Sequence, residues 1–323
     1  MQNSLQNLAG IVRTDYYRSG AVRHCTLDAK NEVSTNCGKL IPRFGEMTVR
    51  RKNTSSLSFY ENGAVKRVAL EQQMPVKTPL GEISAELVTF YKSGALKRFF
   101  PLDGQINGYW SEQDEEGLLE ALELKLPIGG LKAKIIGCCF YENGAVKSLT
   151  LWPTQTVHVN TDFGNVSVRS GLSFFENGAL KSLEPAQPTA VPTPIGLLKA
   201  YDAAAVGINA DTNSLEFDES GSVCALTVPG TIFKATRSDG RAETVGPVMA
   251  VSPLDDESMI EIPVRVCFAN GSVILSVNGQ PNEYDLKSTQ FIIEPKKQLP
   301  AKCSGGNCAA CGMCSISQES AVQ

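Results

Sequence analysis

One ten-residue segment of this chain occurs several times. Residues 59–68 read Phe-Tyr-Glu-Asn-Gly-Ala-Val-Lys-Arg-Val, and residues 140–149 and 174–183 repeat this segment with few changes. More divergent copies begin at Tyr16, Phe90, Phe217 and Phe268. A chain that reuses one short unit builds an array in which each unit packs on its neighbours, and the units at the ends diverge. The repeat therefore predicts an array rather than an ordinary globular enzyme domain.

Each copy has the pattern of a β-hairpin. Asn-Gly between aromatic and β-branched residues favours a two-residue type I′ turn, which needs positive φ at both central positions. With Asn62-Gly63 at the turn, Phe59 is expected to face Lys66 across the hairpin. The glycines at positions 63, 94, 144 and 178 are then expected at equivalent hairpin tips. Alternation along the strands leaves apolar residues on both faces, which predicts neighbours on both sides.

A second turn pattern alternates with these hairpins. It occurs at residues 42–45, 78–81, 127–129, 161–164 and 193–196, as in Thr78-Pro79-Leu80-Gly81. Proline presets φ for the second position of a tight turn, and glycine supplies the left-handed position that ends it. The two patterns together predict an all-β fold, an elongated antiparallel β-hairpin repeat array with a short Cys-rich C-terminal tail.

Three regions follow from this organisation. The array is expected over 1–200, a divergent continuation or a small β domain over 201–300, and the Cys-rich tail over 301–323. Residues 111–124 combine an N-cap serine with early acids and leucines, but Gly117 interrupts a helix there. We therefore expect an acidic loop over 111–117 and a strand over 118–126. The carboxylates there are interpreted as a solvated turn rather than a metal site. They are Glu112, Asp114, Glu115 and Glu116.

The repeat core resembles the MORN-repeat family. The likeness is to the bacterial variant that reads approximately Tyr-Tyr-Glu-Asn-Gly-Lys-Leu-Lys-Ser and occurs in MORN-like antitoxins and surface proteins. Segments 140–149 and 174–183 carry it most clearly, and 103–110 resembles a linking Gly-rich hairpin of that family. The clear copies here are spaced more widely than the family's repeats. The resemblance implies an elongated β array used for protein contact or scaffolding, with no shared catalytic residues.

The tail holds the one chemical motif. Cys303, Cys308, Cys311 and Cys314 are spaced C-x4-C-x2-C-x2-C among small residues. The last three reproduce the C-x2-C-x2-C run of bacterial ferredoxins, although the fourth ferredoxin cysteine lies downstream of that run and Cys303 lies upstream. The spacing favours a [4Fe-4S] cluster, with Zn as the alternative metal and redox thiols or a disordered appendage as further alternatives.

The other six cysteines and two histidines suggest no site. Cys25, Cys37, Cys138, Cys139, Cys224 and Cys267 lie mostly in apolar strand contexts and are expected as small buried hydrophobes. His24 and His158 belong to no recognisable catalytic motif, and no P-loop, dinucleotide or hydrolase fingerprint occurs. His24 and the adjacent Cys25 are expected on opposite faces of a strand, which separates base from nucleophile. We therefore do not expect an enzyme.

Composition and charge limit the expected cellular location and the expected class of partner. Hydrophobic residues make up 42% of the chain, but no run of eighteen apolar residues occurs, so no transmembrane helix is expected. The first ten residues lack the pattern of a signal peptide, which predicts a cytoplasmic location. The formal net charge is −4. In the best copies the lysine after the turn is balanced by a glutamate before it, so we expect no basic stripe and no nucleic-acid partner.

Three functions remain. The first is a non-catalytic cytoplasmic scaffold or interaction protein whose strand edges and aromatic rows bind another protein. The second is an electron-transfer or cluster-carrying accessory subunit of a redox enzyme, with the tail holding the cluster. The third is an antitoxin-like protein that neutralises a partner, as the MORN resemblance implies.

Overall fold

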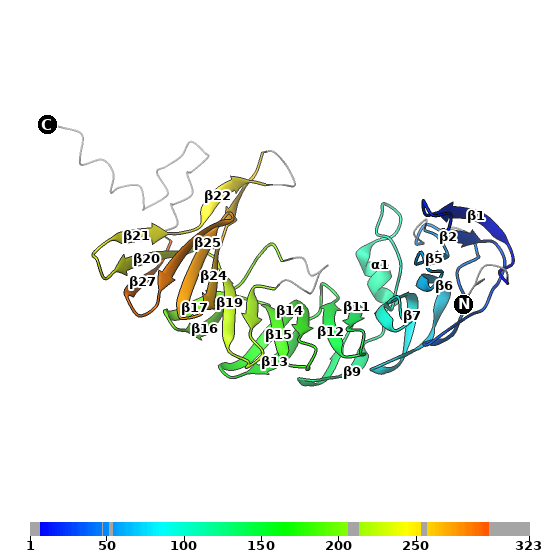
Figure 1. The fold of residues 1–323 in the computed structure, drawn as a ribbon, viewed down its shortest axis with the longest axis horizontal. Coiled ribbons are helices and arrows are strands. Elements are labelled where there is room, and N and C mark those ends of the chain that lie inside the picture. Colours follow the sequence, from blue (N-terminus) through cyan, green and yellow to red (C-terminus); the bar gives the residue numbers. More distant parts are fainter. Residues whose placement is uncertain (1–6, 47, 52–53, 206–212, 253–256, 297–323) are drawn as a thin grey trace, which may run out of the picture.

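The computed structural model describes residues 7–46, 48–51, 54–205, 213–252 and 257–296 of the chain. Strands make up 59% of the structure and helix 2%. Figure 1 shows an elongated, curved array in which the chain advances from one end to the other. The predicted all-β hairpin array is therefore confirmed. No helix in these described ranges is long and apolar enough to cross a membrane.

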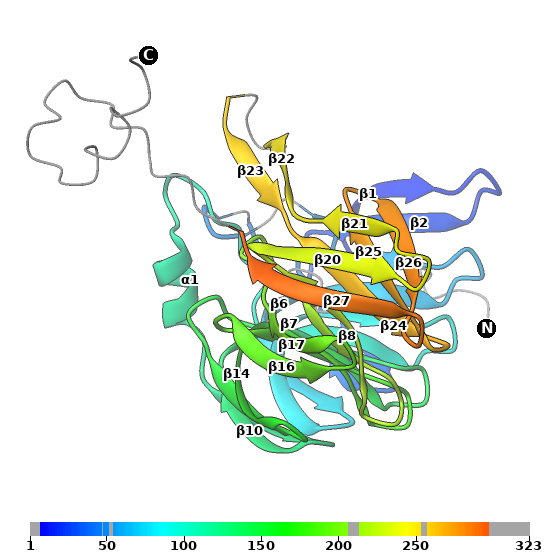
Figure 2. The same ribbon diagram turned by 90° about the vertical axis from the view of Figure 1, so that its left-hand side faces the viewer.

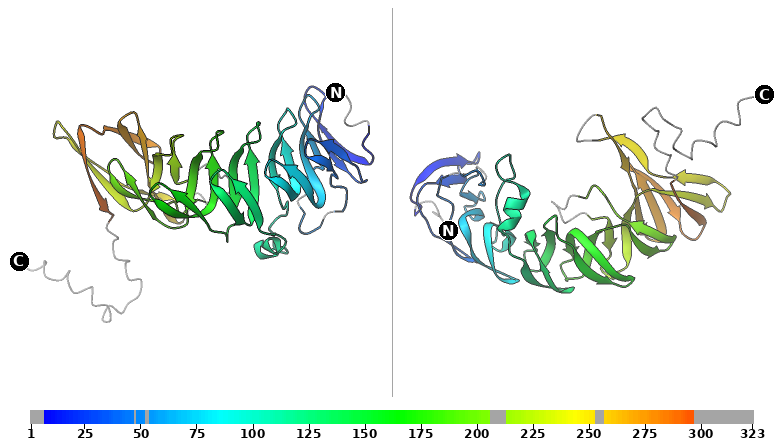
Figure 3. Two further views of the ribbon diagram at one scale, coloured as in Figure 1. Left: turned by 90° about the horizontal axis from the view of Figure 1, so that it is seen from below. Right: turned by 180° about the vertical axis from the view of Figure 1, so that it is seen from behind.

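One sixteen-stranded antiparallel sheet runs through the array (Figure 3). Its path is β1-β2-β5-β6-β7-β8-β11-β12-β14-β15-β18-β19-β24-β25-β26, and β13 pairs with β14 beside it. The strands are β1 (Ile11–Tyr16), β2 (Val22–Leu27), β5 (Leu57–Phe59), β6 (Val65–Thr78), β7 (Gly81–Phe90), β8 (Leu96–Phe100), β11 (Ile135–Phe140), β12 (Val146–Leu151), β13 (Val157–Thr161), β14 (Gly164–Phe174), β15 (Leu180–Pro185), β18 (Leu215–Phe217), β19 (Val223–Val228), β24 (Val264–Ala269), β25 (Ser272–Val277) and β26 (Gln280–Asp285). The path crosses residue 200 without a break, so the same sheet extends into the predicted 201–300 region.

Smaller sheets flank the main one. They are β3 (Val33–Thr35) with β4 (Gly38–Leu40), β9 (Leu122–Leu126) with β10 (Gly129–Ala133), β16 (Thr189–Thr193) with β17 (Gly196–Ala200), β22 (Val248–Val251) with β23 (Met259–Ile262), and the three-stranded β21 (Ala242–Val245), β20 (Thr231–Arg237) and β27 (Thr289–Pro295). In Figure 1, β9 and β13 lie along the outer side of the curve. The β22–β23 pair projects from the far end of the array (Figure 2).

A single row of apolar side chains forms the centre of the core. Successive register partners across thirteen strands are all at most 1% exposed. They are Cys25, Leu57, Val68, Val88, Phe99, Cys138, Leu149, Leu172, Leu183, Leu215, Leu226, Val266 and Leu275. Because each fully buried large apolar side chain contributes about 1.5–3 kcal/mol, each hairpin adds its own share of stability to the array.

The hairpin tips of the repeat differ from the predicted type I′ turn. Gly63 N donates to Tyr60 O over 2.8 Å, and Tyr60 N donates to Ala64 O over 2.8 Å. Gly63 has a φ of 82°, whereas Asn62 is absent from the positive-φ residues. The loop therefore has three residues, and only its glycine is left-handed. The glycines at 63, 94, 144 and 178 do occupy equivalent tips, with φ between 82° and 90°.

The two-residue turn occurs at the divergent end instead. Asn270 and Gly271 both have positive φ, at 51° and 79°, and Ala269 pairs directly with Ser272. Asn278-Gly279 forms the same turn between β25 and β26, with φ of 48° and 75°. Among the repeat copies, the Asn-Gly dipeptide therefore predicts the turn type in the copy that least resembles the repeat.

A β-bulge follows each repeat tip that has the three-residue loop. Phe59 pairs with Val65 and Ser58 with Arg67, so Lys66 has no register partner. The prediction that Phe59 faces Lys66 is therefore wrong by one residue, because the longer loop shifts the pairing. A bulge of one extra residue re-aims a side chain and increases local twist. The same break in register occurs at Arg23, Lys97, Lys147 and Lys181 in the other copies.

The second turn pattern also forms hairpins. Thr78 pairs with Gly81, whose φ is 108°, and Thr78 Oγ1 donates to Gly81 O over 2.8 Å. The prediction for 42–45 is wrong, because that segment forms only an isolated bridge from Pro42 to Leu70. The hairpin turn of the second type lies instead at residues 35–38, which join β3 to β4.

Tips of the two hairpin types meet in pairs. A Cβ at Gly94 would lie 3.3 Å from Asn36, one at Gly144 would lie 3.5 Å from Pro79, and one at Gly178 would lie 3.3 Å from Pro127. Asn36 Nδ2 also donates to Gly94 O over 3.0 Å. The two rows of turns therefore interlock along the array.

The acidic segment 111–117 is a helix rather than a loop. Ser111 and Asp114 form a capping box at the start of α1 (Glu112–Gly117). A capping box satisfies two free backbone donors at a helix start, which stabilises even this short helix. The expected strand begins later than predicted, as β9.

Candidate functional site

A ladder of tyrosine hydroxyls joins successive hairpins. Tyr60 Oη donates to Phe90 O over 2.8 Å, and Tyr91 Oη donates to Phe140 O over 2.7 Å. Tyr17 reaches Phe59 O, and Tyr141 reaches Phe174 O, in the same way. Each acceptor is the residue before the aromatic residue of the next repeat tip. The second aromatic position of the repeat therefore fixes one hairpin to the next.

The bulge residues place a cation over each of these rings. Lys66 Nζ lies 5.5 Å from the centre of the Tyr60 ring, and Lys97 Nζ lies 5.5 Å from that of Tyr91. The same contact is made by Arg23, Lys147 and Lys181 with the rings at positions 17, 141 and 175. We call Arg23, Lys66, Lys97, Lys147 and Lys181 the bulge cation row. The bulges therefore align one cation per hairpin.

A groove of 450 Å³ opens beside this row. Its floor includes successive register partners His24, Ser58, Arg67, Thr89 and Arg98, on the face of the sheet opposite to the apolar row. The remaining lining residues are Tyr60, Lys66, Phe90, Lys97 and Phe100. Among the residues that the structure describes, the lining therefore holds four permanent cations and no carboxylate.

Three of these cations are available to a ligand. Within the described part of the chain, Lys66, Lys97 and Arg98 make no ion pair. Arg98 instead lies over the Phe100 ring at 5.8 Å. Arg67 is committed to the protein, since it donates to Ser55 O over 3.0 Å and pairs with Asp103 at 3.3 Å. The groove can therefore bind an anion through Lys66, Lys97 and Arg98.

His24 lies at one end of the groove. Its Nδ1 is 2.9 Å from Ser58 Oγ, and Asp15 faces it in register from β1. Burial and the charge of Arg23 lower the pKa of His24 below its usual 6.5. Cys25 points into the core, 1% exposed, and burial raises the pKa of its thiol to about 11. The predicted separation of His24 from Cys25 is confirmed.

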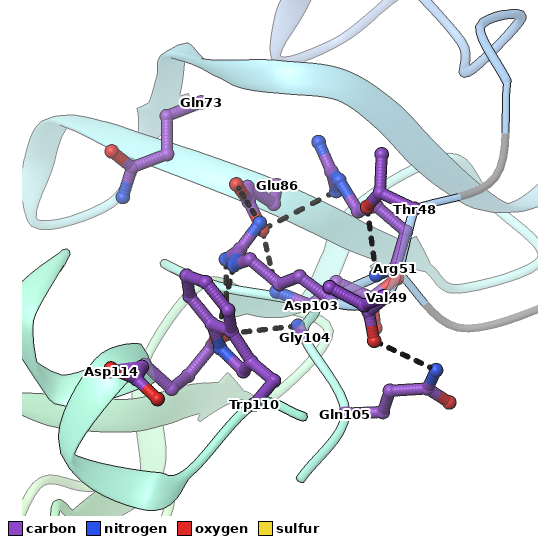
Figure 4. A network of polar contacts seen from close by, with 12 residues as sticks. Thr48, Val49, Arg51, Gln73, Glu86, Asp103, Gly104, Gln105, Trp110 and Asp114 are labelled. Carbon is purple, nitrogen blue, oxygen red and sulfur yellow. Dashed lines mark hydrogen bonds and ion pairs between the residues drawn. The ribbon is translucent and has the colours of Figure 1, made fainter. Parts of the chain in front are cut away.

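A buried polar network links α1 to β7 (Figure 4). Arg50 donates to both carboxylate oxygens of Glu86, at 3.0 and 2.8 Å, and to both of Glu115, at 2.7 and 2.9 Å. Glu115 also accepts from Trp110 Nε1 over 2.7 Å. Glu115 is 4% exposed, so the expectation that it belongs to a solvated turn is wrong. Sequence spacing alone does not reveal that Arg50 lies opposite it.

Asp103 connects the network to Arg67, which lines the groove. Asp103 N donates to Glu86 Oε2 over 2.8 Å, while the Asp103 carboxylate pairs with Arg67. Removing one member of a buried ion-pair network leaves an unpaired charge and costs about 3–5 kcal/mol. The network therefore gives Arg67 and the strands around it a rigid support. The charged side chains of the network pair with one another.

The predicted metal site lies outside the described residues. Cys303, Cys308, Cys311 and Cys314 all belong to 297–323. In the part of the chain that the structure describes, no group of three His, Cys, Asp or Glu side chains is arranged to hold a metal ion. Of the six other cysteines, four are buried and Cys224 and Cys267 are half-buried, which agrees with their expected role as small hydrophobes.

The groove residues were missed by reasoning from sequence alone. The available signal was the recurrence of a basic residue in every copy from Arg23 to Lys181, but the assumed two-residue turn gave these residues strand partners. Comparison with known proteins adds no further identification. No protein-family model matches the chain, and no curated protein and no solved structure is significantly similar to it.

Proposed function

We propose that this chain is a non-catalytic cytoplasmic repeat scaffold that binds another protein through the groove and the bulge cation row. The observation that carries the proposal is a set of three cations, Lys66, Lys97 and Arg98, that make no ion pair with any described residue and surround a groove in which the described lining has no carboxylate. Cations that no internal partner neutralises favour an external anionic partner, because charge complementarity speeds encounter and sets specificity.

The aromatic rows support this proposal in a different way from that expected. The tyrosine hydroxyls donate to the next hairpin, and one face of each ring is covered by a cation. The rings therefore hold the array together and position the cations, and the cations form the contact surface. A rigid array that presents regularly placed side chains is suited to recognition of an extended surface.

The outer edge of β1, which pairs with no other described strand, is a second support for a scaffold. β1 pairs with β2 on one side and is the first strand on the sheet path. Its Val12 and Tyr16 are 58% and 61% exposed. An unpaired strand edge can accept a strand from a partner. β1 lies next to the strand that carries Arg23, so one partner can contact both.

Quantitative affinity purification tests the proposal. The full chain, tagged and expressed in its own cells, is compared with the variant Lys97→Gln, Arg98→Gln, and any protein recovered near one copy per chain is purified and titrated back by calorimetry. We expect one such protein, which binds the wild type and loses at least tenfold in affinity for the variant. A toxin-like protein at this ratio would identify the antitoxin-like role. Failure to recover any stoichiometric protein would refute the scaffold function.

A further inference from the structure

We infer that the groove and the first three cations of the bulge cation row bind an extended acidic segment of the partner that carries a carboxylate at every third residue. This inference rests on the proposed function and names the chemistry of its partner. Its basis is the spacing of Arg23, Lys66 and Lys97, one per hairpin, together with the charge of the groove between them.

The spacing of the row follows from the sheet. Arg23, Lys66 and Lys97 lie on β2, β6 and β8, and one strand separates each from the next on the sheet path. Neighbouring strands lie about 4.8 Å apart, so successive cations recur about every 9.6 Å. In a polyproline II segment, residues three apart lie on the same face and about 9.3 Å apart. Such a segment, lying across the strands, brings one side chain to each cation.

Charge identifies the side chain as a carboxylate. The groove lining contains no Asp or Glu, and Lys66, Lys97 and Arg98 make no ion pair within the described residues. The tips beside the first and third cations carry Arg18 and Lys92, whereas the second tip and both later Asn-Gly tips carry glutamate, at 61, 142 and 176. The row is therefore most basic over the first three hairpins.

A protein segment fits this surface better than single-stranded nucleic acid. Binding of single strands depends on aromatic rings that stack on the bases. Here Lys66, Lys97 and Arg98 cover one face of the Tyr60, Tyr91 and Phe100 rings. The chain's own residues 297–323 also fit poorly, because they contain two lysines and a single glutamate.

Peptide binding by the purified full chain tests the inference. Fluorescence anisotropy compares three labelled fifteen-residue peptides: five Glu-Pro-Pro repeats, five Gln-Pro-Pro repeats, and a peptide of the Glu-Pro-Pro composition with its glutamates in one block. We expect the periodic glutamate peptide to bind at least tenfold tighter than the glutamine peptide and about threefold tighter than the block peptide. Its affinity should fall as salt is raised, because exposed charge pairs are screened.

Two double variants locate the site. Lys97→Gln, Arg98→Gln should weaken binding about tenfold, on the order of the loss expected for two exposed charge pairs, one of them an arginine fork. The matched control is Lys125→Gln, Lys199→Gln, on β9 and β17, which should bind as the wild type does. Circular dichroism confirms that both variants are folded.

Each contrary result overturns a defined part of the inference. Equal binding of the periodic and block peptides would refute the spacing. Tighter binding of a thymidine oligonucleotide of equal charge would replace the acidic segment by nucleic acid. A purified partner that binds the Lys97→Gln, Arg98→Gln variant normally would refute the groove as the contact surface. A partner that loses affinity for the variant but is not displaced by the periodic glutamate peptide would refute the acidic segment alone and leave the proposed function intact. Absence of any partner would refute the scaffold function itself.

Discussion

Removal of a single hydroxyl from the tyrosine ladder should lower the stability of the protein by a measurable amount. In Tyr91→Phe the hydroxyl that donates to Phe140 O over 2.7 Å is removed, while the ring beneath Lys97 remains. A net hydrogen bond of this kind contributes about 0.5–1.5 kcal/mol. Tyr91 is half-buried and Phe140 fully buried, so water replaces the lost donor poorly. We expect Tyr91→Phe to lower the free energy of unfolding by about 1 kcal/mol.

The reverse substitution is a sharper test. The fifth hairpin has Phe175 at the tyrosine position, with Lys181 over its ring at 5.7 Å. By analogy with the other copies, the hydroxyl in Phe175→Tyr is expected to reach the carbonyl of Phe217. This variant should gain about 1 kcal/mol. Because most single substitutions destabilise a protein, the sign alone is informative.

Urea titration followed by circular dichroism measures both effects, with Tyr109→Phe as the matched control. Tyr109 is 87% exposed, and its variant should unfold as the wild type does. Because a repeat array gains stability from each interface between neighbours, a lost bond can uncouple two segments and broaden the transition. Equal stability of Tyr91→Phe and Tyr109→Phe, or destabilisation by Phe175→Tyr, would refute the role assigned to the ladder.

Three further predictions concern the tip, the groove and the tail. Gly144→Val should cost about 1–2 kcal/mol because its φ is 90°, whereas Lys147→Ala should cost about 0.5 kcal/mol, and equal losses in urea titration would contradict the turn assignment. Burial lowers the pKa of His24 in the folded protein, so the unfolded chain binds the proton more tightly and stability should fall as the pH drops below 6.5, less steeply in His24→Asn when melting is followed between pH 8 and 5.5. Anaerobically purified protein should carry iron and acid-labile sulfide, or zinc, that the Cys308→Ser, Cys311→Ser variant loses while its β spectrum is retained; metal-free wild type would contradict the ligand assignment.

The repeat predicts the fold but not the turn type. Reuse of one decapeptide with aromatic and β-branched residues is enough to predict antiparallel hairpins, and tip glycines such as Gly63 lie where that pattern places them. The loop has one more residue than Asn62-Gly63 implies, because Tyr60 O accepts from Gly63 N and Ala64 closes the hairpin. A propensity rule for two residues cannot detect this, and the same loop hydrogen bonds recur at Phe175 and Asp218, where the tyrosine is absent.

The same one-residue difference explains why the groove was missed. A two-residue turn gives Lys66 a partner in Phe59, so the lysine reads as an ordinary strand residue balanced by Glu61. The observed bulge leaves Lys66 without a register partner and directs it over Tyr60. Long-range contacts such as Arg50 to Glu115 have no sequence signal at all, because sixty-five positions separate the two residues.

The end of the ladder defines the length of the interlocked array. The copy at 217–224 has Asp218 at the tyrosine position and Cys224 at the bulge position. Asp218 uses its carboxylate within its own turn, accepting from Ser220 N over 2.9 Å and Ser222 N over 3.0 Å. An aspartate that closes its own turn has no group to extend toward the next strand. The last rung of the ladder is the bond from Tyr141 to Phe174 O, because Phe175 has no hydroxyl to reach the copy at 217–224. The sheet continues past this copy without the hydroxyl ladder, so we expect the hairpins before it to unfold as one cooperative unit, and hydrogen exchange should show a step in protection at β18.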